Sequence, residues 1–230
     1  MTGLNGKVAV ISGGSRGIGF ATAEAFLARG ALVAVCAHDP ERLRAAEARL
    51  RAQGEVMAVA VDVRDAGQVR DFVRAVEARF GRIDVLVNNA GVVSVGEFAE
   101  EDYASMDAVV DVNVKGVLYL TRVALPGMLR RGEGVIVNVS SGAGLSGYPD
   151  LVSYCASKFA VVGFTESLDK ETRDRGVRVY AVCPGAVATD MQMQYSGRKI
   201  GIPPEQVAER IVRLAAEQPS SKTGRCVVIP

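Results

Sequence analysis

Histidine is nearly absent from the sequence, since His38 is the only one among 230 residues. A metal centre built on several histidines is therefore excluded, and a Ser-His-Asp hydrolase would depend on a histidine near the end of the second predicted strand. Cysteine is also scarce, and no two cysteines form a C-x-x-C pair. We expect reduced thiols, with neither a disulfide framework nor a metal site, at Cys36, Cys155, Cys183 and Cys226.

The chain also lacks an excess of either charge, with 27 basic and 26 acidic residues and a net charge of +1. Bulk charge therefore gives no reason to expect a nucleic acid or an anionic membrane as partner. No apolar run is long enough to cross a bilayer, and no signal peptide is visible before the glycine-rich loop that begins by Ser12. The sequence predicts a cytoplasmic protein that binds neither nucleic acid nor a membrane.

Strand-like and helix-like segments alternate along the chain, and 49% of the residues are hydrophobic. The strand-like runs are rich in Val, Ile and Ala without polar alternation, which indicates a sheet buried on both faces. The alternation predicts one α/β domain over residues 1–230 with a parallel, doubly wound sheet. The expected strands are Lys7–Ser12, Ala31–Cys36, Val56–Val61, Ile83–Asn88, Gly134–Val139, Val177–Cys183 and Arg225–Ile229. The expected helices are Arg16–Arg29, Pro40–Gln53, Ala66–Phe80, Glu101–Leu129, Val152–Arg175 and Pro203–Gln218.

A glycine-rich turn, Ser12–Gly19, joins the first predicted strand to the first predicted helix. Its glycines let the backbone turn tightly and approach a pyrophosphate, while the helix N-terminus offers free N–H groups and a positive dipole end. An ordinary strand-to-helix turn is the alternative. Three placed glycines after an N-terminal strand favour a nucleotide site.

The end of the second strand bears on which nucleotide is bound. An acidic residue there would hold a ribose 2′-hydroxyl, but this chain has Ala37 followed by His38, and Asp39 fits better as a helix cap before Pro40. Arg16, inside the glycine-rich turn, has the donors to reach a 2′-phosphate, or it is a solvated surface charge. We therefore expect NADP(H) in preference to NAD(H), with NAD(H) possible.

Tyr154 and Lys158 stand four residues apart within a predicted helix, and Ser141 lies thirteen residues before the tyrosine. Residues at i and i+4 share a helix face, so the phenol and the ammonium group point into one space. A neighbouring cation favours the phenolate and lowers the pKa of a phenol. With a serine hydroxyl beside them, these groups predict a proton-transfer site for a carbonyl or an alcohol.

Taken together, these motifs resemble the short-chain dehydrogenase/reductase family over nearly the whole chain. Ser12–Gly19 resembles the family's T-G-x-x-x-G-x-G, with serine in place of threonine, and Asn88-Asn89-Ala90-Gly91 matches the motif after the fourth strand. Ser141, Tyr154 and Lys158 match the catalytic serine, tyrosine and lysine. The resemblance implies a Rossmann fold of about seven parallel strands, in the order 3-2-1-4-5-6-7, with helices on both faces.

The family also implies a role for individual residues. Tyr154 would be the general acid and base, with Ser141 holding the reacting oxygen, Lys158 binding the nicotinamide ribose, and Asn113 holding a water near that lysine. Asp62 and Val63 would contact adenine, and Pro184-Gly185 with Thr189 would hold the nicotinamide carboxamide. The implied cofactor-binding residues are Gly13, Ser15, Arg16, Gly17, Ile18, Gly19, His38, Asp62, Val63, Asn89, Ala90, Gly91, Tyr154, Lys158, Pro184, Gly185, Val187 and Thr189.

Structural roles remain as alternatives at several of these positions. Asp62 could cap the helix that follows, Asn113 could be a buried polar group bonded to backbone, and Ser140 competes with Ser141. The main functional reading is a carbonyl reductase or alcohol dehydrogenase that takes a small-molecule substrate. The alternatives are a 3-oxoacyl-carrier-protein reductase and a catalytically silent nucleotide-binding sensor. In the first of these an acidic carrier would meet Arg130, Arg131 and Arg173, which are equally well explained as solvated helix ends.

Residues 190–202 are expected to form a short substrate lid, and Met191–Ile202 carries no predicted element. The expected substrate pocket is mostly apolar and contains Ser94, Leu145, Tyr148, Ala186, Met191 and Met193. Apolar residues on more than one face of the Glu101–Leu129 and Val152–Arg175 helices, including Phe159, Val162 and Phe164, predict a homodimer or homotetramer.

Overall fold

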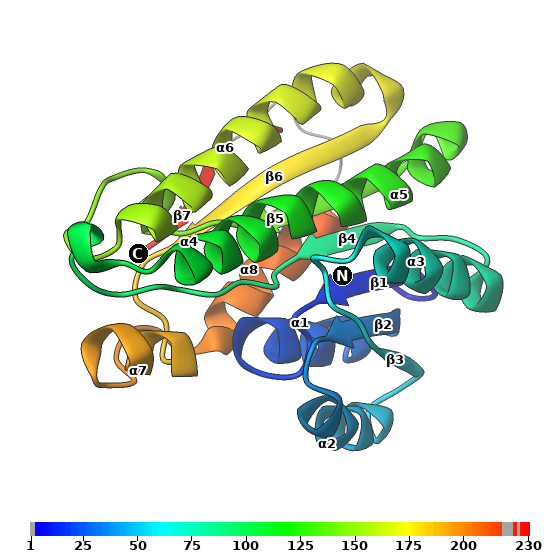
Figure 1. Cartoon of the computed structure of the whole chain (residues 1–230). Helices are drawn as coiled ribbons and strands as arrows, with labels where there is room; N and C mark the ends of the chain where they lie inside the picture. The colour runs from blue at the N-terminus through cyan, green and yellow to red at the C-terminus, as the bar shows by residue number, and fades with distance from the viewer. Residues whose placement is uncertain (1–2, 218–222, 225) are drawn as a thin grey trace.

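The computed structural model of the chain describes residues 3–217, 223–224 and 226–230. Within these residues a seven-stranded sheet has the order β3-β2-β1-β4-β5-β6-β7 (Figure 1), and every paired register is parallel. This order confirms the expected one. The strands are β1 Val8–Ser12, β2 Leu32–Ala37, β3 Val56–Ala60, β4 Val85–Asn88, β5 Gly134–Val139, β6 Val177–Pro184 and β7 Cys226–Ile229.

Helices cover both faces of the sheet, as the doubly wound arrangement requires. Helices α1, α2 and α8 lie on one face of the sheet and α3, α5 and α6 on the other (Figure 1). Their apolar side chains pack against the strands. Because each face is covered, the strands are mostly apolar without polar alternation, and all residues of β1, β4 and β5 are buried. The helices are α1 Gly17–Leu27, α2 Pro40–Arg51, α3 Ala66–Phe80, α4 Tyr103–Val110, α5 Gly116–Arg131, α6 Val152–Thr172, α7 Asp190–Ser196 and α8 Pro204–Ala216.

Helix α2 begins where the sequence predicts it. The Asp39 side chain accepts hydrogen bonds from the backbone N–H groups of Glu41 and Arg42, at 3.0 and 3.1 Å, and Pro40 occupies the first helical position, where its missing N–H costs nothing. Asp39 is therefore a helix cap. Helix α1 begins one residue later than expected, because Arg16 has an extended backbone and precedes the first helical residue.

Two parts of the chain differ from the prediction. The single helix expected over Glu101–Leu129 consists of α4 and α5, joined by a π-helical turn at Asp111–Lys115. The stretch expected to lack structure contains α7, which Thr189 caps and which ends at Gly197 with a φ of 69°. The apolar periodicity is too short there to reveal a helix of two turns.

The predicted ends at Gln218 and Arg225 lie outside the described residues. Strand β7 nevertheless pairs with β6 from Cys226 to Ile229, at the edge of the sheet. Among the described helices, none combines the length and the apolar character that a membrane span requires.

Candidate active site

The carboxyl ends of the parallel strands meet at one edge of the sheet, and the predicted site residues lie there. Ser12 ends β1, Asn88 ends β4, and Pro184 ends β6. In doubly wound sheets this edge is where ligands bind. The fold therefore brings together motifs that are far apart in the sequence.

The glycine-rich turn needs its glycines for steric reasons. Gly13 and Gly17 have φ values of 67° and 55°, in the left-handed region that favours glycine. A Cβ atom on Gly13 would lie 2.8 Å from the Asn89 amide nitrogen, and one on Gly19 would lie 2.3 Å from the Gly13 carbonyl oxygen. Ser15 is half-buried in the same turn, and Ile18 packs against the core beneath it.

The N-terminus of α1 differs from those of α2, α3, α4 and α7. Asp39, Asp65, Asp102 and Thr189 cap those four helices with side-chain oxygens. By contrast, the side chain of Arg16 makes no capping hydrogen bond to α1, and the first turn of α1 contains no acidic residue. The first N–H groups and the positive end of the helix dipole thus suit a phosphate, so this turn fits the pyrophosphate of a dinucleotide.

The end of β4 is tied directly to the glycine-rich turn. The Ser12 hydroxyl oxygen accepts hydrogen bonds from the N–H groups of Asn89 and Ala90, at 3.0 and 3.1 Å. The Asn89 side chain in turn donates to the carbonyl oxygens of Ser12 and Gly13, at 2.9 and 3.2 Å. The serine in place of the family's threonine therefore retains a hydroxyl that fixes this turn.

The neighbouring Asn88 points into the protein interior. Its side-chain nitrogen donates to the hydroxyl of Thr121 at 2.9 Å and to the side-chain oxygen of Asn138 at 2.8 Å. This buried amide network joins β4, β5 and α5, and it accounts for Asn88 as a structural residue.

The end of β2 carries no free carboxylate for a ribose. Ala37 is buried, and the carboxylate of Asp39 is occupied by the start of α2. His38 is exposed, with its Nδ1 atom 3.9 Å from the Asp62 carboxylate. The Arg64 guanidinium pairs with the same carboxylate at 2.6 Å, and its hydrogen bond holds the pKa of Asp62 below the usual range.

Val63 follows Asp62 in the chain, and its side chain points into the protein interior. It is buried, and a Cβ atom on Gly116 would come within 2.8 Å of its side chain. Close packing of α5 against the segment after β3 thus fixes the position of Val63.

Tyr154 and Lys158 lie on one face of α6, as their spacing predicts. Both side chains are buried, with relative exposures of 8% and 4%, and the lysine Nζ atom lies 5.5 Å from the centre of the tyrosine ring. The Lys158 ammonium donates to the backbone carbonyl of Val139 at 3.0 Å. The end of β5 therefore anchors the lysine beside the phenol.

The structure distinguishes Ser141 from its neighbour Ser140. The Ser140 hydroxyl donates to the Lys158 carbonyl oxygen at 3.0 Å, a structural bond that ties the end of β5 to α6. The Ser141 hydroxyl lies beside the Tyr154 hydroxyl, where its hydrogen bond lowers the pKa of the phenol. Ser141 is thus the serine that shares a space with Tyr154.

Burial shifts the pKa values of Tyr154 and Lys158 in opposite directions, because it disfavours the charged form of each group, the phenolate and the ammonium. Burial raises the pKa of Tyr154 to about 12, although the Ser141 hydrogen bond opposes the change. Burial also lowers the pKa of Lys158 to about 8. The expected lowering of the phenol pKa is therefore wrong, since desolvation outweighs the one contribution that lowers it, the Ser141 hydrogen bond.

Asn113 lies in the π-helical turn between α4 and α5 and is buried. Its side chain accepts from the Val92 N–H at 2.8 Å and donates to the Val92 carbonyl oxygen at 2.9 Å and to the Ser157 hydroxyl at 3.0 Å. A Cβ atom on Gly91 would lie 3.3 Å from the Asn113 side-chain oxygen and 3.6 Å from the Lys158 nitrogen. Asn113, Gly91 and Lys158 therefore lie close together in one part of the site.

The segment after β6 runs beside the glycine-rich turn. Gly185 donates its N–H to the Ile229 carbonyl oxygen at 2.9 Å, which joins the segment to β7. Val187 is buried and forms a bridge with Ile202. Farther along, a Cβ atom on Gly17 would lie 3.4 Å from a methyl group of Thr189. The two segments thus lie side by side at this edge of the sheet.

The expected substrate pocket is only partly formed in this structure. The Met191 sulfur lies 3.8 Å from the Tyr154 hydroxyl, and Met191 and Val93 pack against a buried cluster that contains Tyr154. Leu145, Tyr148 and Met193 are exposed, and Ser94 and Ala186 also lie outside that cluster. Sequence reasoning missed Val93, which follows the Asn-Asn-Ala-Gly motif without a signal of its own.

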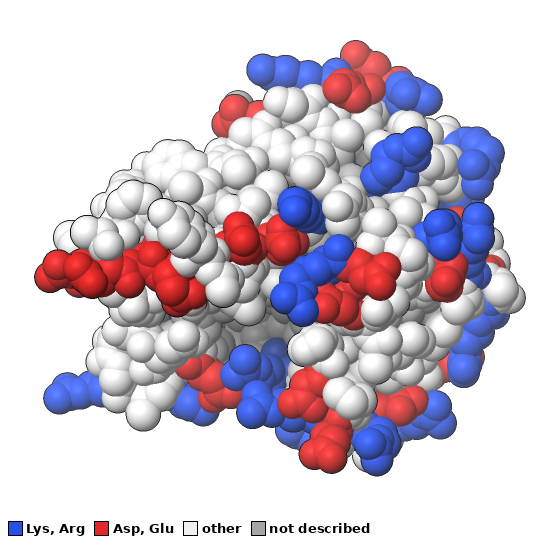
Figure 2. Space-filling model, viewed as in Figure 1, with Lys and Arg blue, Asp and Glu red and all other residues white. Residues whose placement is uncertain are grey.

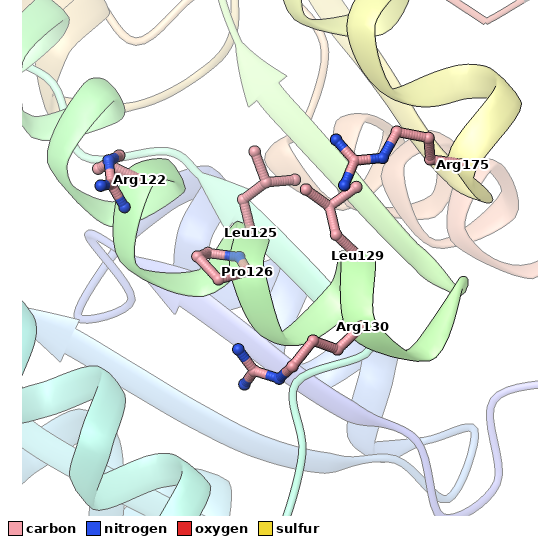
Figure 3. A pocket seen from close by; sticks show the side chains of 6 residues that line it. All are labelled: Arg122, Leu125, Pro126, Leu129, Arg130 and Arg175. Atoms are coloured by element: carbon pink, nitrogen blue, oxygen red, sulfur yellow. The ribbon is translucent and has the colours of Figure 1, made fainter.

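Two cavities lie outside the space in front of the phenol. One, of about 420 Å³, is lined by α5 and the turn after α6 (Figure 3), with lining residues Arg122, Leu125, Pro126, Leu129, Arg130 and Arg175. The other, of about 440 Å³, lies between residues 93–105 and Gln194 and includes Glu97, Glu100, Glu101 and Asp102. Figure 2 shows both signs of charge mixed over the right-hand and lower parts of one face, with a row of acidic side chains at its left-hand edge.

Comparisons with known proteins agree with the fold and the motifs. The family profile described as short chain dehydrogenase matches residues 7–199. The chain is 37% identical to a 3-oxoacyl-(acyl-carrier-protein) reductase of Thermotoga maritima, over 98% of this chain and 97% of the relative. It is 36% identical to 2-(S)-hydroxypropyl-CoM dehydrogenase 3 of Xanthobacter autotrophicus, over 98% and 96%. The crystal structure of levodione reductase superposes with a TM-score of 0.92 at 30% identity, covering 98% of this chain and 96% of that one.

The fold and the family motifs define a Rossmann-type enzyme. The chain belongs to the short-chain dehydrogenase/reductase family. It is accordingly an oxidoreductase that uses a nicotinamide cofactor and acts on a CH–OH or C=O group of a small molecule.

Proposed function

We propose that this enzyme transfers hydride between NADP(H) and a carbonyl or alcohol substrate, with Tyr154 as the general acid and base. The observation that carries the proposal is the convergence of the Tyr154 phenol, the Ser141 hydroxyl and the Lys158 ammonium at the carboxyl edge of the sheet. A panel of aldehydes, ketones and alcohols, followed by nicotinamide absorbance with both cofactors, tests it. A chain that binds cofactor but turns over none of the panel would instead support the silent sensor.

Each protein group has a distinct role in the proposed reaction. The cofactor supplies or accepts the hydride, and the protein supplies orientation and proton transfer. The Ser141 and Tyr154 hydroxyls hydrogen-bond the reacting oxygen and so orient the substrate carbon. Because burial keeps the Tyr154 phenol protonated at neutral pH, it can donate its proton as the carbonyl oxygen gains charge.

Lys158 supports this proton transfer from a fixed position. Its ammonium group, held by the Val139 carbonyl oxygen, stabilises negative charge on the phenol after the proton leaves. It also supplies donors for the hydroxyls of the nicotinamide ribose. Asn113, in the π-helical turn beside Gly91, would place the water that returns a proton to this lysine.

The proposed cofactor site follows the carboxyl edge of the sheet. The glycine-rich turn would hold the pyrophosphate with Gly13, Ser15, Gly17, Ile18 and Gly19. The adenosine half would lie near His38, Asp62, Val63, Asn89, Ala90 and Gly91, with Arg16 on the 2′-phosphate. The nicotinamide half would lie near Tyr154, Lys158, Pro184, Gly185, Val187 and Thr189.

The cofactor preference gives a direct test of Arg16. We expect the wild type to bind NADPH more tightly than NADH, because Ala37 offers no carboxylate and Arg16 offers a planar set of donors. Arg16→Ala should weaken NADPH binding about tenfold or more and leave NADH binding nearly unchanged, since hydrogen bonds to charged groups contribute about 1.5–3 kcal/mol. Calorimetric titration of both cofactors measures this. Arg70→Ala, an exposed arginine on α3 that pairs with Asp71, is the matched control, and tighter NADH binding by the wild type would refute the assignment.

A 3-oxoacyl-carrier-protein reductase is the second candidate. It is favoured by the three arginines around the α5 cavity, which alternate with apolar side chains and suit an acidic carrier (Figure 3). Arg131 instead donates to the Ile83 carbonyl and Arg173 pairs with Asp169, so Arg130 is the one residue of the expected trio that lines this cavity. Comparing kcat/KM for a 3-oxoacyl group on its carrier and on a short free thioester distinguishes the two candidates.

We further propose that the chain forms a homodimer or homotetramer. Several large apolar side chains on α4, α5 and α6 are exposed, namely Tyr103, Val110, Leu118, Val152 and Phe159. Phe164, by contrast, packs partly against the core. A second copy covering this surface would remove the apolar area from water. Light scattering at micromolar concentration should give at least twice the mass of one chain, and a monomer would contradict the proposal.

The remaining assignments are also proposals. Residues 1–230 would form one domain, in which 190–202 serve as the substrate lid. The cytoplasm would be the working compartment, because the four cysteines are free thiols, three of them buried, as expected in a reducing environment.

A further inference from the structure

The lid, residues 190–202, is fixed at its base, and its first seven residues form α7. The Ala188 N–H donates to the Ile202 carbonyl oxygen at 2.9 Å, and the Ile202 N–H donates to the Ala186 carbonyl oxygen at 3.0 Å. These two backbone hydrogen bonds pair the segment just before the lid with the end of the lid, as in a short parallel β-bridge. Movement of the lid therefore concerns the segment between them, including Asp190 and Met191.

An ion pair joins this segment to the glycine-rich turn. The Arg16 guanidinium lies 2.6 Å from one carboxylate oxygen of Asp190, and the Lys199 ammonium lies 2.6 Å from the other. These two cations lower the pKa of Asp190 to about 2, so the carboxylate is charged at any ordinary pH. The Arg16 and Asp190 side chains are about half exposed, at 55% and 45%, so water screens the pair and it is weak enough to exchange.

The same segment reaches the phenol on its other side. The Met191 sulfur contacts the Tyr154 hydroxyl at 3.8 Å, and the Gln194 side chain donates to the Val93 carbonyl oxygen at 3.3 Å. Met191 thus occupies the space where a substrate oxygen would have to lie. For a substrate oxygen to contact the Tyr154 hydroxyl, the Met191 side chain must leave this position.

We propose that Asp190 holds the lid closed through Arg16, and that the 2′-phosphate of NADP(H) releases the lid by taking Arg16 from Asp190. The proposal rests on the proposed role of Arg16 in cofactor binding. A phosphate carries about 1.5–2 negative charges at neutral pH and three acceptor oxygens, so it competes well with a carboxylate for a guanidinium. Asp190 is then a positioning residue: it opposes NADP(H) binding and makes access to Tyr154 depend on the cofactor.

Two variants with the same charge change test the competition. Asp190→Asn should tighten NADP⁺ binding about threefold, within the range expected for an exposed ion pair, and leave NAD⁺ binding unchanged. Glu41→Gln is the matched control, because Glu41 is exposed in the first turn of α2, beside the end of β2, and its carboxylate is not paired with Arg16. Calorimetric titration of both cofactors against both variants separates loss of the ion pair from general loss of negative charge.

A second measurement follows the lid itself by amide hydrogen exchange over residues 190–199. In the wild type, 2′,5′-ADP should speed exchange there severalfold while 3′,5′-ADP, with the same charge, should not; both probes lack nicotinamide, which would contact the lid directly. Asp190→Asn should exchange rapidly without any ligand.

The outcomes separate this inference from the proposed function. Suppose that Arg16→Ala weakens NADP⁺ binding, as the proposed function requires. If Asp190→Asn then changes neither NADP⁺ affinity nor hydrogen exchange in the lid, or if it weakens NADP⁺ binding, Asp190 does not compete for Arg16 and the inference is wrong. An equal gain in NADP⁺ affinity in Glu41→Gln would also overturn it. If Arg16→Ala leaves NADP⁺ affinity intact, the cofactor assignment itself fails.

Discussion

Tyr154→Phe is expected to lower kcat by about 10²–10⁴-fold, the range typical of a lost general acid or base. The variant removes one titratable hydroxyl and little volume from a buried position, so the fold and the cofactor site should remain. Initial rates of carbonyl reduction, measured beside calorimetric titration of NADP⁺, provide the test. We expect the cofactor dissociation constant to change less than about twofold, well below 1.4 kcal/mol.

The control for this result is Tyr103→Phe. Tyr103 is 84% exposed at the start of α4, so the same chemical change there should leave kcat unaltered. If Tyr154→Phe turns over at the wild-type rate, the proton comes from another group and the proposed mechanism is wrong. Equal losses in both variants would point to an effect unrelated to the site.

Lys158→Ala is expected to damage both cofactor binding and turnover. The ammonium stabilises the phenolate formed during the reaction and supplies donors for the ribose, so its removal should lower kcat by about 10²-fold or more. Cofactor affinity should fall about tenfold, the size of one lost hydrogen bond to a charged group. Titration and steady-state kinetics of the same preparation measure the two effects separately.

Because Lys158 is buried, its replacement leaves a cavity, and thermal unfolding must be measured for the same variant. Lys170→Ala, an exposed lysine on the same helix, is the control for the loss of one charge on α6. If the Lys158→Ala protein is folded and binds the cofactor as tightly as the wild type, Lys158 does not bind the nicotinamide ribose. If kcat of that protein is also unchanged, Lys158 does not take part in proton transfer.

The direction of the pKa shift of the Tyr154 phenol could not be predicted from the sequence. The spacing of Tyr154 and Lys158 places them on one face of α6, and this depends only on helix geometry. The pKa depends on how much water reaches each group, which is a property of the packing around Met191, Val93 and the end of β5. The sequence therefore predicted the pair correctly and the sign of the phenol shift wrongly.

Ser140 and Ser141 give a second example. In the sequence, only their spacing to Tyr154 separates them. In the structure, strand β5 ends at Val139, so the two hydroxyls leave the strand end in different directions. Ser140 binds the Lys158 carbonyl, and Ser141 lies beside the phenol.

The sequence by itself determined the alternation of strands and helices, the glycine-rich turn, the helix cap at Asp39 and the Tyr154–Lys158 pair. All of these depend on local periodicity or on backbone conformations that particular residues require. Tertiary structure alone decided the π-helical turn around Asn113, the contact of Met191 with Tyr154 and the ion pair between Arg16 and Asp190. These features join residues up to 174 positions apart, and the folded sheet brings such residues together because all its strands end at the same edge.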